Sequence, residues 1–229
     1  MPPEHIHEEV ELLDLDLASY QLEWVCMAPR WREHYLSLDM RRHYAYLRTV
    51  LQALTWLRGP DRWVLKSPQH LEQLGPLHET FPDATVVLTH RDPVAVVQSA
   101  ITMMAYGERM RRTRIDLAAL AAYWVDRIER LLRACVRDRD RIPAAQSVDV
   151  PFHDFMADDL GTLERIYAAA GLPMTAEARA ALDAFVAENR RGKHGRIVYD
   201  LERDFGLDPA VVRRRFDFYF DRFAVRPED

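Results

Sequence analysis

Apolar residues recur at helical spacing through most of this chain, and three short runs have the density of buried strands. The pattern predicts helices over residues 8–27, 39–58, 70–80, 93–104, 116–138, 158–170, 175–189 and 208–223. It predicts strands over residues 62–66, 84–90 and 146–152, and a loop over residues 190–200. Because helices separate consecutive strands, we expect a helix-rich α/β fold built on a parallel sheet.

Length and composition favour one domain with a sizeable core. The 229 residues are 48% hydrophobic and carry a net charge of −5, which disfavours nucleic-acid binding. No apolar run reaches the roughly 18 residues of a membrane span, and residues 1–13 lack the features of a secretory signal. Cys26 and Cys135 fit no disulfide or metal spacing. These features favour a cytoplasmic protein.

The segment WVLKSPQHL sets Lys66 and Ser67 at the end of the predicted strand 62–66, with His70 in the next turn. Ligands of parallel sheets bind at the carboxyl ends of the strands. A lysine there can reach a phosphate or sulfate, and a nearby histidine can accept the proton of an alcohol. The alternative is that Lys66 is a solvated strand end and His70 an ordinary residue at a helix start.

The segment THRDPVAVVQS ends the predicted strand 84–90 on charged residues and opens a helix at once, near Pro93. Arg91 offers a planar fork of donors that suits a phosphate, and Ser99 adds a hydroxyl. Backbone N–H groups at the start of this helix would strengthen the attraction for an anion. The alternative pairs Arg91 with Asp92 or with a distant carboxylate.

A third candidate site is the stretch ENRRGKHGRIVYD, residues 188–200, in which basic residues alternate with glycines. Glycine lets backbone amides approach an anion closely. The alternative is a solvated loop, as most runs of charge are.

Four residues near the N-terminus, His5, His7, Glu8 and Glu9, contain metal-ligand side chains. Neither a zinc-binding helix motif nor a third matched ligand accompanies them. We therefore expect no metal site.

Three blocks of sequence, in this order, resemble the sulfotransferases that use 3′-phosphoadenosine 5′-phosphosulfate. They are K-S-P-x-H-L at residues 66–71, F-P-D-A at 81–84, and H-R-D-P with a later serine at 90–99. The likeness is to the bacterial branch of that family and runs from about residue 3 to residue 223. It implies a P-loop-NTPase-like parallel sheet flanked by helices in three layers, that nucleotide as sulfuryl donor, and no metal.

The resemblance assigns the anion sites. In that family an arginine and a serine eight residues later hold the 3′-phosphate of the nucleotide, which carries over to Arg91 and Ser99. The basic glycine loop closes over the same phosphate, which implies Arg191, Gly192 and Lys193.

The resemblance also bears on the reacting groups. The strand-end lysine lies beside the transferring sulfuryl group, which implies Lys66. Better-studied members have a catalytic histidine two residues later, where this chain has Pro68, so His70 is the candidate base. A carboxylate of Glu8 or Glu9 is a rival for that role.

Two more residues belong to the implied nucleotide site. Ser67 follows the lysine, and Phe152 stands where members often have Tyr-Glu-Asp at the end of the third strand. The phenylalanine ring could stack on adenine.

Family members begin with a strand, a glycine-rich phosphosulfate loop and a helix, and residues 1–60 contain no such unit. We therefore expect the C-terminal portion of a sulfotransferase, with a missing N-terminal segment or a dimer as partner. Residues 1–229 would form one domain: a helical lid and acceptor segment (1–60), a sheet core with the 3′-phosphate site (61–155) and a helical part with the basic loop (156–229).

The implied reaction transfers a sulfuryl group to a hydroxyl or amine of a small-molecule, lipid or carbohydrate acceptor. A catalytically inactive nucleotide-binding or partner-dependent half-domain, and a kinase relative of the P-loop class, stay open as alternatives. Tyr20, Trp24, Trp31 and Tyr35 could stack on an acceptor ring, but their spacing favours core packing.

Overall fold

The sheet of this computed structural model has two parallel strands, β1 (Val86–His90) and β2 (Ser147–Pro151), among the residues that the structure describes. Those residues are 7–59, 62–190, 193, 195 and 200–228. Val86 pairs with Ser147 and His90 with Pro151, so the carboxyl ends of both strands lie at the same edge. The predicted strands near 84–90 and 146–152 and their parallel arrangement are confirmed.

The prediction of a strand over residues 62–66 is wrong. This segment has no regular secondary structure, and the side chain of Val64 is 92% exposed. An apolar run becomes a strand only where a neighbouring strand accepts its hydrogen bonds, and no described strand lies beside this one.

Helices make up most of the rest. The helices that precede the sheet are α1 (Val10–Asp14), α2 (Gln21–Cys26), α3 (Pro29–Ser37), α4 (Met40–Arg58), η1 (Pro68–Glu72, a 3₁₀ turn) and α5 (Leu74–Thr80). Those between the strands are α6 (Pro93–Arg111), α7 (Leu117–Asp138) and the 3₁₀ turns η2 (Arg139–Arg141) and η3 (Ala144–Gln146). Those that follow are α8 (Phe152–Ala157), α9 (Asp159–Ala169), α10 (Ala176–Glu188), α11 (Leu201–Phe205), α12 (Pro209–Arg215) and α13 (Asp217–Arg222).

Local sequence signals account for the long helices. The Asp39 side chain accepts a hydrogen bond from the backbone N–H of Arg41 and caps α4, which ends at Gly59 in a left-handed conformation (φ 70°). The predicted helices over 39–58 and 116–138 are confirmed as α4 and α7.

The predicted helix over residues 8–27 is instead two short helices, α1 and α2. Leu17 between them has φ 51°, a left-handed conformation that ends α1. The loop is held by Gln69, whose side-chain oxygen accepts from the Tyr20 N–H and whose side-chain nitrogen donates to the Ala18 carbonyl. This long-range contact outweighs the helical pattern.

Other helices also differ from the prediction. The predicted helix 70–80 is divided at Gln73 into η1 and α5, and the predicted helix 208–223 is divided at Phe216 into α12 and α13. The short helices α3, α8 and α11 were not predicted, since helices of so few residues carry little periodic signal.

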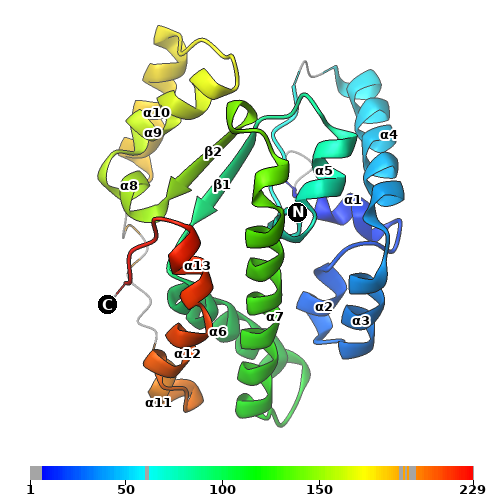
Figure 1. Ribbon diagram of the computed structural model, residues 1–229, viewed down its shortest axis with the longest axis vertical. Helices are drawn as coiled ribbons and strands as arrows, with labels where there is room; N and C mark the ends of the chain where they lie inside the picture. Colours follow the sequence, from blue (N-terminus) through cyan, green and yellow to red (C-terminus); the bar gives the residue numbers. More distant parts are fainter. Residues whose placement is uncertain (1–6, 60–61, 191–192, 194, 196–199, 229) are drawn as a thin grey trace.

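Helices cover both sides of the sheet, so the predicted α/β class is confirmed. In Figure 1, α9 and α10 lie beside β2, and α4 and α5 lie on the opposite side of the molecule. The larger apolar core packs around Trp124 of α7 and Ile101 of α6, and a second core packs around Leu13 and Tyr44. None of the helices in the described part of the chain is long and apolar enough to cross a membrane.

Candidate functional site

Lys66, Arg91 and Ser99 line a single pocket with a volume of about 740 Å³. Lys66 comes from the loop before η1, Arg91 directly follows β1, and Ser99 lies on α6. A primary amine, a guanidinium and a hydroxyl therefore converge on one space, at the edge where the parallel strands end.

The position of Arg91 depends on how β1 ends. His90, 1% exposed, turns into the core, where its Nδ1 accepts from the hydroxyl of Tyr219 at 2.7 Å. Its Nε2 donates to Oδ1 of Asp149 at 2.7 Å. Burial raises the pKa of Asp149, but hydrogen bonds from His90 and Arg139 outweigh this effect and hold the pKa below its usual value. With His90 anchored, the next side chain, Arg91, points to the other side of the strand.

Asp92 caps the N-terminus of α6, and its carboxylate accepts three hydrogen bonds there. One carboxylate oxygen accepts from the N–H of Val94 at 2.8 Å. The other accepts from Arg213 and from the backbone N–H of Glu228, both at 2.7 Å. The N–H of Val94 is thus already bonded within the protein.

One face of α6 forms a wall of the pocket. Val96, Ser99, Ala100 and Met103 line it at spacings of three and four residues, the period of an α-helix. The opposite wall is lined by Tyr20, Gln21, Trp24 and Val25, together with His7, Glu8, Val10 and Glu11. Apolar side chains therefore flank the charged end of the pocket.

The guanidinium of Arg91 is paired with a carboxylate from the C-terminal tail. Its Nε and Nη2 donate to the two oxygens of Glu228 at 2.8 and 2.7 Å. It also lies over the ring of Phe152, 4.3 Å from the centroid. These three side chains border a smaller cavity of about 180 Å³. The structure therefore contains the pairing that was the alternative from the sequence, Arg91 with a distant carboxylate, although no local signal could identify Glu228 as that carboxylate.

Lys66 is held at both ends. Its Nζ forms an ion pair with the carboxylate of Glu8, which lines the same pocket. Its backbone N–H donates to Oε2 of Glu9 at 2.9 Å. The acidic pair considered from the sequence as a rival source of the base therefore contacts Lys66 directly.

His70 is enclosed and is not among the residues that line the pocket. Its side chain is 14% exposed, its Nε2 lies 2.5 Å from Oε1 of Glu9, and its Nδ1 lies 2.6 Å from the hydroxyl of Tyr44. Ser67 is also buried and caps η1, where its hydroxyl accepts from the N–H of Gln69.

The remaining predicted nucleotide-binding residues lie in the basic loop. Arg191 and Gly192 lie outside the described residues. Lys193 donates through Nζ to the carbonyl oxygen of Glu188 at 3.1 Å and is not among the residues that line either cavity.

The candidate aromatic residues divide between pocket and core. Tyr20 and Trp24 line the pocket, whereas Tyr35 is 1% exposed and belongs to the core. Trp31 packs against the same core and donates through Nε1 to the carbonyl oxygen of Ser19.

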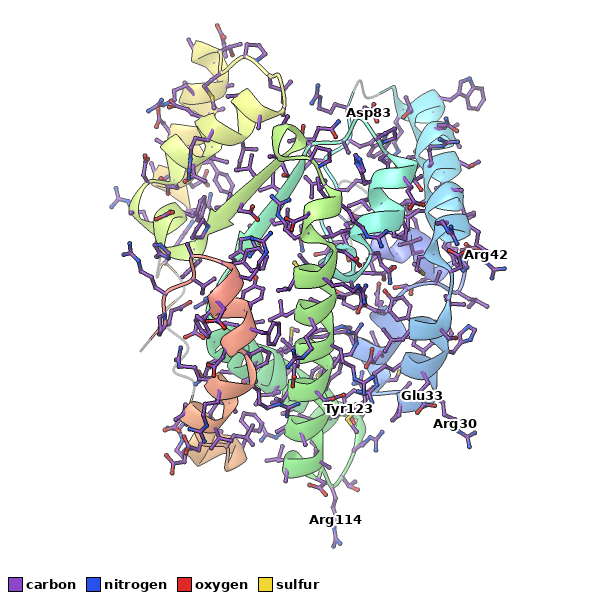
Figure 2. The ribbon with its side chains drawn as sticks, in the orientation of Figure 1. Arg30, Glu33, Arg42, Asp83, Arg114 and Tyr123 are labelled. Carbon is purple, nitrogen blue, oxygen red and sulfur yellow. The ribbon has the colours of Figure 1, made fainter. Side chains whose placement is uncertain are left out.

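A buried ion network fixes the wall that α2 contributes. Arg127 of α7 donates to Glu23 of α2 at 2.9 Å and to both oxygens of Glu72 at 2.6 and 2.9 Å. The hydroxyl of Tyr123, which lies on the side of α7 that faces α2 and α3 (Figure 2), donates to Glu23 at 2.6 Å. Charges this deeply buried are stable only when paired, so the network ties α2 and η1 to α7. Within the described part of the chain, no group of three metal-ligand residues gathers.

Comparisons with known proteins identify the family and the fold. The model of the sulfotransferase family named Sulfotransfer_3 matches residues 1–176. The crystal structure of sulfotransferase STF1 from Mycobacterium tuberculosis H37Rv is 31% identical, with a TM-score of 0.80, over 94% of this chain and 56% of that one. That of sulfotransferase STF9 from Mycobacterium avium is 24% identical, with a TM-score of 0.86, over 97% of this chain and 57% of that one.

This chain thus spans little more than half the length of those two proteins. A search of curated proteins finds no match. The family model nevertheless covers more than half of the 229 residues, including Lys66, Arg91 and Ser99. On that evidence the chain belongs to the sulfotransferase family.

Proposed function

We propose that this chain binds 3′-phosphoadenosine 5′-phosphosulfate and supplies part of the site that transfers its sulfuryl group to a hydroxyl or amine. The observation that carries the proposal is the convergence of Lys66, Arg91 and Ser99 on one pocket. Membership of the sulfotransferase family supports the same reaction class.

Arg91 and Ser99 would hold the 3′-phosphate of the nucleotide. The planar guanidinium can donate two parallel hydrogen bonds to a phosphate, as it now does to the carboxylate of Glu228. The ring of Phe152 packs against one face of the Arg91 guanidinium and would lie next to the nucleotide. A phosphate that binds here has to displace Glu228 from Arg91.

Lys66 would stabilise the negative charge that develops around the transferring group. In the reaction, the acceptor oxygen or nitrogen forms a bond to sulfur while the bond between sulfur and the bridging oxygen of the nucleotide breaks. The bridging oxygen leaves with the electron pair as part of 3′,5′-bisphosphoadenosine. A fixed ammonium at that position lowers the barrier through electrostatic stabilisation.

Glu8 is better placed than His70 to serve as the base, which takes the proton that the substrate hydroxyl or amine loses. Its carboxylate lines the pocket and contacts Lys66. His70, the base favoured by the sequence, has both ring nitrogens engaged by Glu9 and Tyr44. A base must come within hydrogen-bond reach of the acceptor, which favours the residue that faces the pocket.

Isothermal titration calorimetry of the 229-residue chain with 3′,5′-bisphosphoadenosine tests the nucleotide site. Arg91→Ala should weaken binding at least about tenfold, because a charge-assisted bidentate contact is lost. Arg109→Ala is the matched control, since Arg109 is an exposed arginine of α6 that does not line the pocket. Unchanged affinity in Arg91→Ala would rule out Arg91 as a ligand of the 3′-phosphate.

The same titration separates the proposal from an inert half-domain. A folded wild-type chain that binds no bisphosphate would favour a catalytically inactive or partner-dependent module instead.

A further inference from the structure

We propose that Glu9 is a positioning residue that fixes Lys66 in the pocket. The inference rests on the proposed function, because it concerns the lysine assigned there to the sulfuryl group. Glu9 does not line the pocket and would touch neither nucleotide nor acceptor.

Glu9 is almost completely buried, and its two carboxylate oxygens bind different parts of one segment. The residue is 5% exposed. Oε2 accepts from the backbone N–H of Lys66 at 2.9 Å, and Oε1 lies 2.5 Å from Nε2 of His70. One side chain from the N-terminal region therefore holds the loop on both sides of Ser67.

The protons in this cluster follow from the partners. A carboxylate can only accept, so Nε2 of His70 carries a proton and donates it to Glu9. In the neutral imidazole that carries its proton on Nε2, Nδ1 of His70 accepts from the hydroxyl of Tyr44 at 2.6 Å. The result is a directed chain in which Tyr44 donates to His70, and His70 donates to Glu9.

Electrostatics keep Glu9 and Tyr44 in the protonation states that this chain of hydrogen bonds requires. Burial raises the pKa of Glu9, but hydrogen bonds from His70 and from backbone N–H groups outweigh burial, so the pKa is lower than usual and Glu9 stays ionised. Burial, with the nearby charges of Glu72 and Glu9, holds the pKa of Tyr44 well above its usual value, so its hydroxyl keeps its proton. Glu9 can therefore only accept and the hydroxyl of Tyr44 can donate, as the directed chain requires.

Because Glu9 and Glu8 are adjacent in the chain, they hold two different parts of Lys66. Glu9 fixes the backbone of Lys66, while the adjacent Glu8 pairs with the ammonium of the same lysine. The loop before η1 has no strand partner in the described chain that could hold it. The hydrogen bond from Lys66 to Glu9 takes over that role.

Two ligands distinguish positioning of Lys66 from a general effect on the fold. Adenosine 3′-phosphate carries only the phosphate assigned to Arg91 and Ser99. The bisphosphate 3′,5′-bisphosphoadenosine also carries the 5′-phosphate, to which the sulfuryl group is attached in the donor. We therefore use the ratio of the affinity for 3′,5′-bisphosphoadenosine to the affinity for adenosine 3′-phosphate. This ratio measures what the groups near the 5′-phosphate, Lys66 among them, contribute to binding.

We expect Glu9→Ala to lower that ratio about threefold to tenfold, the range of one or two hydrogen bonds, with little change for adenosine 3′-phosphate. Lys66→Ala should lower the same ratio, and the double variant should fall no further than Lys66→Ala. Glu9→Gln should retain most of the ratio, because its amide oxygen still accepts from the Lys66 N–H. Glu79→Ala, an exposed acidic residue of α5 that does not line the pocket, is the control.

An unchanged ratio in a folded Glu9→Ala chain, or an equal loss for both ligands, would overturn the positioning role. Should Glu9→Ala fail to fold, Tyr44→Phe removes only the hydroxyl that orients His70. It should lower the ratio by a smaller factor, and an unchanged ratio in that variant would likewise overturn the inference. A wild-type chain that binds neither ligand would refute the proposed function itself, and the positioning role with it.

Discussion

The ion pair between Arg91 and Glu228 predicts that a single change in the C-terminal tail tightens nucleotide binding. Glu228 accepts two hydrogen bonds from the guanidinium that would hold the 3′-phosphate. Because carboxylate and phosphate compete for the same donors, Glu228→Gln should favour the phosphate. The substitution keeps the two backbone hydrogen bonds of residue 228: its N–H donates to Asp92, and its carbonyl oxygen accepts from Arg213, so the tail should stay in place.

The magnitude follows from the exposure of the pair. The side chains of Arg91 and Glu228 are 43% and 30% exposed, so solvent screens much of their attraction. Pairs of this kind contribute up to about 1 kcal/mol, and the bidentate geometry argues for the upper part of that range. Removing this competition should lower the dissociation constant of 3′,5′-bisphosphoadenosine about twofold to fivefold.

Calorimetry at constant ionic strength measures the change. Glu33→Gln is the matched control, because it removes one negative charge from an exposed position of α3 (Figure 2) that lines neither cavity. An equal gain in both variants would indicate long-range attraction rather than local competition. Weaker or unchanged binding in Glu228→Gln would refute the view that phosphate and carboxylate share the guanidinium.

Three other changes test separate parts of the structure. Arg127→Leu should lower the free energy of unfolding by about 3–5 kcal/mol in urea titrations, because it leaves Glu23 and Glu72 buried without a partner; a loss below about 1 kcal/mol would contradict this. Asp149→Asn should cost about 1–2 kcal/mol at neutral pH. Since the native pKa of Asp149 is lowered, its contribution is complete above about pH 4 and is lost as the pH falls, so the difference from wild type should shrink in titrations near pH 3. Ser99→Ala should weaken bisphosphate binding about threefold to tenfold in calorimetry without lowering stability, and unchanged affinity would remove Ser99 from the clamp.

The strand–helix unit around Arg91 could be read from the sequence because its signals are local. An apolar run, a capping aspartate and a proline at the first helical position follow one another within a few residues, and each acts on its neighbours. Ser99 falls on the pocket face of α6 as a consequence of helical periodicity. The local signals could therefore predict that Arg91 and Ser99 line the same pocket, and their joint binding of a phosphate stays a prediction.

The failures of prediction involve partners that are remote in the chain. Residues 62–66 have the composition of a strand, but a strand also needs a neighbour, which the sequence pattern does not contain. The break between α1 and α2 depends on Gln69, 49 residues from Tyr20. Glu228 lies 137 residues from Arg91, so no spacing rule could have joined them.

Glu8 and Glu9 illustrate how the fold assigns different roles to identical neighbours. The sequence treats them alike, as two acids that could serve as a base. In the structure the side chain of Glu8 is 38% exposed at the pocket, whereas that of Glu9 is 2% exposed and bonded on both oxygens.

Solvent contact and position decide which carboxylate can exchange a proton with a bound acceptor. Glu8 can lose its contact with Lys66 when another anion approaches the ammonium. Glu9 cannot be released without the loss of two hydrogen bonds, from Nε2 of His70 and from the backbone N–H of Lys66, at a cost of about 1–3 kcal/mol for a buried group left unsatisfied. This difference supports the proposal that Glu8 accepts the proton and that the buried Glu9 holds the lysine in position.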